Sequence, residues 1–170
     1  HDSNFTMESF IQRYNSDLAN DFGNLLSRVT TLIKKNYGGI IPEPGELNDL
    51  DLVIKEKGIA LSKLVHGLVD EMRLNDAIEE IMQFIRIVNK YMEENAPWKL
   101  VKEDKVAAGK ILYVAAEALR LGAVLLSPIM PNRTRLLFDT LNVNGYSYSW
   151  GELKPGKKLK NHDPLFPRIK

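Results

Sequence analysis

Asn20-Asp21-Phe22-Gly23-Asn24-Leu25-Leu26-Ser27-Arg28 is the centre of a long periodic stretch, which predicts a single helix from about Phe5 to Tyr37. At about 100° per residue, the apolar side chains of this helix share one broad arc. They are Ile11, Tyr14, Leu18, Phe22, Leu25, Val29, Leu32 and Ile33. The opposite arc is polar and is centred on Asn24, with Arg13, Asp17, Asn20, Arg28 and Lys35 around it. The stretch therefore predicts an amphipathic helix whose apolar side packs into a core.

Asn24 and Arg28 are one helical turn apart on the polar arc, so we expect neighbouring side chains that are fully exposed to solvent. The simplest interpretation is a solvated helix face, and periodicity alone favours it. The alternative is a binding pair, because an amide and a guanidinium on a rigid support form a compact hydrogen-bonding unit.

Composition indicates an ordinary globular chain of 170 residues, 44% apolar and 26% charged, which is enough for one domain. The absence of cysteine excludes disulfides and thiolate metal sites. No apolar run approaches the roughly 20 residues of a membrane-spanning helix. The net charge of +1 argues against a general nucleic-acid binder but permits a small, local contact with an RNA loop. Residues 151–170 are locally basic, with six cationic side chains against two acidic ones.

Four further helices are predicted from periodicity, caps and prolines. Their expected ranges are Asn48 or Asp49 to about Arg73, Ala77 to about Glu94, Asp104 to Leu126, and Asn132 to about Leu141. In the first of these, the apolar residues with helical spacing are Leu52, Ile59, Leu64, Val65 and Leu68. From Asn142 onward the periodicity is lost and turn residues dominate. The expected fold is all-α: a five-helix bundle over residues 1–141, with an irregular C-terminal arm over residues 142–170 in the same domain.

Known catalytic motifs are missing from the sequence: it has no P-loop, no GxSxG, no HExxH and no glycine-rich dinucleotide fingerprint. His66 and Asp70 are one turn apart, but two potential metal ligands without a third are more simply an ordinary polar contact. Glu93 and Glu94 are most simply part of a solvated face. We therefore expect no catalytic residue and no metal site in this chain.

Trp98 follows Pro97 at the end of a predicted helix, where the proline disfavours a helical residue before it. A large aromatic side chain at such a position is either a plug of the core or an exposed platform for stacking. The pattern alone favours the core plug.

Segments along the whole chain, taken together and in order, resemble the anticodon-binding domain of methionyl-tRNA synthetase of bacterial type. They are Asn15 to Arg28, Asn89-Lys90-Tyr91, Ala96-Pro97-Trp98, Leu126-Ser127-Pro128-Ile129-Met130-Pro131, Leu153-Lys154-Pro155-Gly156 and Pro164-Leu165-Phe166-Pro167-Arg168-Ile169. Anticodon domains of the class I synthetases for valine, isoleucine or leucine have similar bundles. The combination of Asn24 and Arg28 with Ala96-Pro97-Trp98 points to the methionine branch.

The resemblance implies that Asn24, Arg28, Pro97 and Trp98 correspond to the family's anticodon-contacting positions. The expected partners are the anticodon loop of tRNA(Met), with the sequence CAU, and the synthetase's own catalytic domain. In the family, ATP and often zinc belong to that catalytic part, whose His-x-Gly-His and Lys-Met-Ser-Lys-Ser signatures are not in these 170 residues. The resemblance thus implies a cytoplasmic protein without a membrane partner and no cofactor or aminoacylation activity in these residues alone.

Two matters stay open at this point. The competing class of function is a helical module that binds another protein through Trp98, with no RNA. The resemblance also implies that the arm runs toward the catalytic part, anchored by Leu165 and Phe166, whereas it could equally cover the bundle itself.

Overall fold

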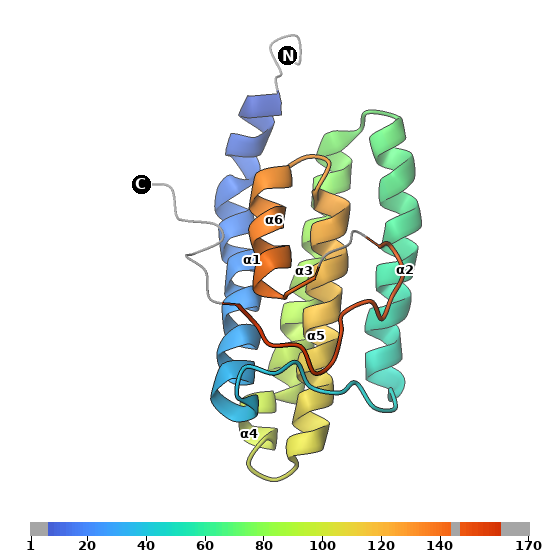
Figure 1. Ribbon diagram of the computed structural model, residues 1–170. Coiled ribbons are helices and arrows are strands. Elements are labelled where there is room, and N and C mark those ends of the chain that lie inside the picture. Colours follow the sequence, from blue (N-terminus) through green and yellow to red (C-terminus); the bar gives the residue numbers. More distant parts are fainter. Residues whose placement is uncertain (1–6, 144–146, 161–170) are drawn as a thin grey trace.

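The computed structural model describes residues 7–143 and 147–160, and in this part of the chain it is entirely helical apart from loops and one isolated β-bridge (Figure 1). The helices are α1 (Met7–Tyr37), α2 (Asp49–Asp70), α3 (Leu74–Asn95), α4 (Pro97–Leu100), α5 (Lys105–Leu126) and α6 (Pro131–Thr140). All five predicted helices are present, so the prediction of an all-α bundle is confirmed. The single-turn helix α4 was not predicted.

Helix boundaries follow local capping chemistry. Asn48 caps α2 as predicted: its Oδ1 accepts from the Asp51 N–H and its own N–H donates to Asp51 Oδ2, both at 2.9 Å. Asp104 caps α5 through a single bond, accepting from the N–H of Ala107 at 3.0 Å. The predicted start of α3 at Ala77 is wrong by one turn. Asp76 lies inside the first turn, where its carboxylate pairs with Arg73 at 2.9 Å and faces the positive end of the helix.

Helix α2 buries a different arc from the one its apolar spacing suggested. Val65 and Leu68 are buried as expected, but Leu52, Ile59 and Leu64 are exposed. The buried arc instead contains Ile54, Gly58, Leu61, Val65 and Leu68. Gly58 explains the choice, because a Cβ there would lie 3.0 Å from Leu121 Cδ2 and 3.3 Å from Phe84 Cζ. The absence of a side chain lets α2 approach α3 and α5 closely along this arc.

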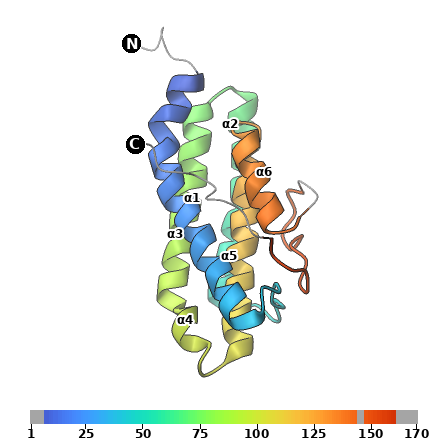
Figure 2. The ribbon, with the colours of Figure 1, turned by 60° about the vertical axis from the view of Figure 1, so that its left-hand side comes forward.

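Helix α5 is the centre of the bundle, surrounded by α1, α2, α3 and α6 (Figures 1 and 2). From Ala108 to Leu126 every residue except Lys110 is buried, including the charged Glu117 and Arg120. Their side chains pair at 2.6 Å, Arg120 Nε to Glu117 Oε1. Buried charges are expensive unless all their hydrogen-bonding groups are satisfied, so this pair requires further partners.

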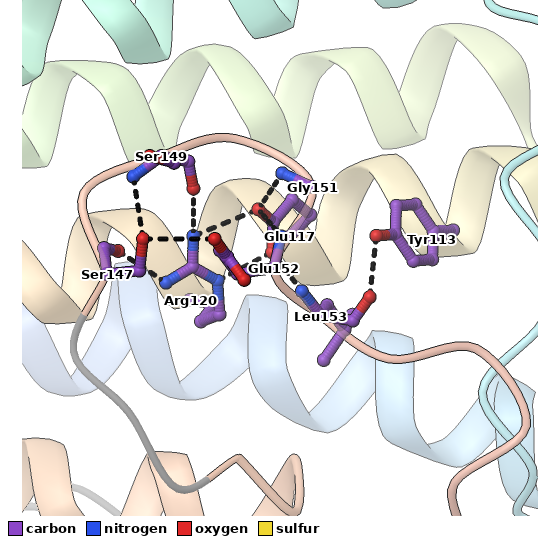
Figure 3. Close-up of polar contacts among 8 residues, drawn as sticks. All are labelled: Tyr113, Glu117, Arg120, Ser147, Ser149, Gly151, Glu152 and Leu153. Atoms are coloured by element: carbon purple, nitrogen blue, oxygen red, sulfur yellow. Dashed lines mark hydrogen bonds and ion pairs between the residues drawn. The ribbon is translucent and has the colours of Figure 1, made fainter.

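The segment 147–160 supplies those partners as it crosses the bundle (Figure 3). Glu117 accepts backbone N–H groups of Gly151, Glu152 and Leu153. Arg120 donates to the carbonyls of Ser147 and Ser149, each at 2.7 Å. The described part of the arm is therefore fixed to the bundle by a buried ion pair. The predicted anchor at Leu165 and Phe166 lies outside the described residues, and the division at residue 141 stays a prediction.

Candidate nucleic-acid interface

Helices α1 and α3 lie side by side and run parallel (Figure 2). Two ion pairs join them with the same sequence offset of 65 residues: Arg86 Nε to Asp21 Oδ2 at 3.0 Å, and Arg28 NH2 to Glu93 Oε1 at 2.8 Å. Between the helices is an open polar depression with a volume of about 440 Å³. It is lined by Asn20, Asp21, Asn24, Ser27, Arg28, Arg86, Asn89, Lys90 and Glu93.

Two of the residues that the sequence singled out, Asn24 and Arg28, line this depression, and Trp98 contacts Arg28. The Arg28 guanidinium carbon lies 5.2 Å from the centroid of the Trp98 ring, within the range of a cation–π contact. Asn24 is exposed and shares the depression with Arg28. The structure thus brings Asn24, Arg28 and Trp98 to one water-facing region, from parts of the chain about 70 residues apart.

Trp98 is half-buried and is not a plug of the core. Of the two tryptophans, Trp150 packs against the buried cluster, whereas Trp98 is not among the described residues that do so. Its indole is therefore partly covered and partly accessible to solvent. The preference for a core plug that the pattern gave is not supported.

The Arg28 side chain is less exposed than the prediction of a solvated helix face requires. Its side chain is 32% exposed, because Trp98 lies beside it and Glu93 pairs with it. The expectation that this face is fully exposed holds for Asn24 and is wrong for Arg28. Glu93 is exposed, as expected of a solvated face, and its carboxylate also accepts from the guanidinium. These contacts hold Arg28 in one orientation at the surface.

The turn before Trp98 has an unusual backbone. Ala96 adopts a left-handed conformation, with φ 43°, and ends α3 while its N–H donates to the carbonyl of Met92 at 2.9 Å. Pro97 then occupies the first position of α4, where a proline is well tolerated. Pro97 is buried, so in this structure it orients Trp98 rather than presenting a surface of its own.

The last turns of α3 are anchored by a buried polar group. The hydroxyl of Tyr91 donates to Asp51 Oδ1, and Lys110 Nζ lies 3.3 Å from the other carboxylate oxygen. Burial, followed by the hydrogen bond to Asp51, raises the pKa of Tyr91 far above its usual range. This contact ties the part of α3 that precedes Trp98 to α2 and α5.

Sequence reasoning assigned no role to the α3 side of the depression. Arg86, Asn89, Lys90 and Glu93 share one face of α3 opposite its buried residues, and this spacing was the available signal. No role was predicted for Asp21 either. It accepts from Arg86, and its pKa is raised because burial outweighs the charge of that arginine.

The described residues contain no group of three or more potential metal ligands. His66 Nδ1 lies 2.7 Å from the carbonyl of Ser62, and its ring contacts the ring of Tyr148 at a centroid distance of 4.3 Å. That histidine has the ordinary polar contact that was expected. Within the described part of the chain, no helix is both long and apolar enough to cross a membrane.

Comparison with known proteins places this chain in a family. The model of the anticodon binding domain of methionyl tRNA ligase matches residues 41–170, and that of class I tRNA synthetases (M) matches residues 1–30. The methionine–tRNA ligase of Caldanaerobacter subterraneus is 37% identical over 99% of this chain and 27% of its own length. That of Deinococcus radiodurans is 38% identical over 98% of this chain and 25% of its own length.

A solved structure agrees with these relatives. The apo methionyl-tRNA synthetase of Mycobacterium tuberculosis has a TM-score of 0.86 at 31% identity, covering 98% of this chain and 35% of that one. The chain thus spans about a quarter to a third of the relatives it matches. The matched family model is that of the methionine enzyme, which argues against the anticodon domains of the valine, isoleucine and leucine synthetases. Because its model covers most of the chain, this protein belongs to the family of the anticodon-binding domain of methionyl-tRNA ligase.

Proposed function

We propose that this chain recognises the CAU anticodon of tRNA(Met) through Asn24, Arg28 and Trp98. The observation that carries the proposal is the placement of the Arg28 guanidinium beside the Trp98 ring, with Arg28 lining an open polar depression. Membership of the anticodon-binding family supports it. Pro97 contributes by setting the direction of the helix that carries Trp98.

Stacking on Trp98 supplies affinity in this proposal. An anticodon base that leaves its own stack can lie against an accessible indole, and such a contact contributes roughly 1–3 kcal/mol with little dependence on base identity. Because Arg28 approaches the same ring, the cation also attracts the nearby phosphates of the loop.

Hydrogen bonding by Arg28 and Asn24 supplies selection of the first anticodon base. Cytosine offers acceptors at O2 and N3, and a guanidinium has only donors, five in number. The ion pair with Glu93 uses NH2, which leaves other donors of Arg28 for a base. Asn24 can accept from the cytosine N4 amino group through its amide oxygen. Uracil carries an N–H at position 3, so it would set a donor against a donor, which is costly in a partly desolvated site.

The wider assignment follows from the family and is also a proposal. The chain would act as the tRNA-reading part of a longer methionine–tRNA ligase, an ATP-dependent enzyme of the cytoplasm. The catalytic domain would be its second partner and would hold ATP and, often, zinc. This chain alone would then bind tRNA without activating methionine.

Fluorescence titration with anticodon hairpins tests the proposal. The chain has two tryptophans, so a Trp150→Phe variant reports Trp98 alone. We expect a CAU hairpin to quench this emission at lower concentration than hairpins of identical stem with other anticodons. Equal affinity for all hairpins, or no binding, would overturn the proposal and favour a module that binds protein instead.

A further inference from the structure

A group of lysines lies beyond the proposed base site, at the C-terminal end of α1. Lys35 is seven residues after Arg28, almost on the same line of the helix, so the two Cα atoms are about 10 Å apart along the axis. Lys34 is its exposed neighbour in the same turn. Arg28 contacts Trp98, and both views show α4 and this end of α1 at the same end of the bundle (Figures 1 and 2).

Lys158 joins the two helical lysines from a distant part of the sequence. A Cβ built on Gly39 would lie 3.9 Å from Lys158 Cε and from Lys34 Cγ, so these two stems are within twice that distance of each other. The approach is fixed by the backbone. Ile40 and Lys158 form an antiparallel bridge, and the N–H of Leu159 donates to the carbonyl of Gly39 at 2.8 Å. Leu159 is buried, which turns Lys158 and its charge outward.

Local stability explains only part of this arrangement. Lysines in the last turn of a helix interact favourably with its negative end, which accounts for Lys34 and Lys35. Lys158 is not on a helix, but its side chain lies at the same end of α1, so its charge interacts with that dipole as well. Among the described residues, neither Lys35 nor Lys158 is within ion-pair distance of a carboxylate. In a chain of net charge +1, such a concentration of cations indicates an anionic partner.

We propose that Lys34, Lys35 and Lys158, here called the α1-end lysines, bind phosphates of the RNA strand adjoining the base on Trp98. The inference rests on the proposed function and extends its site from the base to the backbone. Phosphate contacts of this kind set the register of the RNA and carry no sequence information. The α1-end lysines therefore add affinity equally for every anticodon, while Arg28 and Asn24 select.

The salt dependence of hairpin binding tests this inference. The double variant Lys35→Gln with Lys158→Gln is compared with Lys57→Gln with Lys63→Gln, which removes the same charge from exposed positions of α2, on another side of the bundle (Figure 1). Each lost phosphate contact lowers the slope of log affinity against log salt by about 0.7 to 0.9. We expect a loss of about 1.4 to 1.8 in slope for the first variant, equal for CAU and UAU hairpins, and almost none for the second.

The outcomes separate the two proposals. A wild-type chain that prefers the CAU hairpin, with the same slope in both double variants, would overturn the role of the α1-end lysines and leave the base site intact. A slope lost only for the CAU hairpin would overturn it too, because phosphate contacts cannot depend on the base. A wild-type chain that binds no hairpin would overturn both proposals. Far-UV circular dichroism confirms that each variant is folded.

Discussion

The guanidinium carbon of Arg28 lies 5.2 Å from the centroid of the Trp98 ring, so a residue in the middle of α1 and the single-turn helix α4 meet at the surface. The same guanidinium pairs with Glu93 on α3. Arg28 is therefore held between a carboxylate and an aromatic face without being buried. A preformed site of this kind loses less conformational entropy when a ligand binds.

Replacement of Trp98 by alanine should separate binding from stability. The indole is half-buried and is not among the described residues that pack against the core, so we expect the free energy of unfolding to change little. Loss of the stacking surface should weaken hairpin binding by about 1–3 kcal/mol. Urea unfolding and a hairpin titration measure the two quantities. A large fall in stability would show that Trp98 supports the fold after all, and unchanged binding would remove it from the site.

The buried pair on α5 should be essential to stability. Glu117 is fully buried and accepts from Arg120 and from three backbone N–H groups of the arm. The Glu117→Gln variant keeps the shape but leaves the Arg120 charge uncompensated, which typically costs about 3–5 kcal/mol. Urea unfolding measures the loss. Glu94→Gln is the control, because among the described residues Glu94 forms an exposed pair with Lys90 alone. This substitution should change stability by less than about 1 kcal/mol. Equal stabilities of the two variants would contradict the role of the pair.

Stability should fall in alkaline solution because of Tyr91. Burial and the contact with Asp51 raise the pKa of Tyr91 in the folded chain, whereas the unfolded phenol titrates near its ordinary value of 10.0. Above that pH unfolding releases a proton, so the stability that this group contributes is complete below it and declines as the pH rises. The decline from one such group is at most about 1.4 kcal/mol per pH unit.

Comparison with Tyr91→Phe isolates this effect, since the other titrating groups remain in both proteins. We expect the free energy of unfolding of the wild type to fall more steeply than that of the variant between about pH 10 and pH 11. Parallel pH profiles would show that Tyr91 is not protonated differently in the two states.

The fold was largely predictable because its signals are local. The capping box at Asn48 and Asp51, the prolines and the 3.6-residue period fixed which segments are helical. The face that α2 buries was not predictable from apolar spacing, because that helix has apolar residues on more than one arc. Its choice depends on the close approach that Gly58 permits to Leu121. The burial of Glu117 and Arg120 was not predictable either, since an i, i+3 pair of opposite charges is common on exposed helix faces.

The candidate site was predictable only in part. Periodicity placed Asn24 and Arg28 on the polar face of α1, and the resemblance added Trp98 to them. These three residues lie close together because α1 runs parallel to α3. The periodicity of a single helix does not predict how two helices align. For the same reason the ion pair of Glu93 with Arg28 across that alignment was not predicted, although Glu93 is exposed as expected.

Discrimination between CAU and UAU hairpins tests the central proposal, that Arg28 selects the first anticodon base. The ratio of the two dissociation constants is measured at one salt concentration for the wild type, for Arg28→Ala and for Arg86→Ala, a second arginine of the same depression. We predict that wild type and Arg86→Ala prefer CAU by about 1–3 kcal/mol, the cost of an unpaired donor, and that Arg28→Ala loses most of this preference. An unchanged preference in Arg28→Ala would contradict the account.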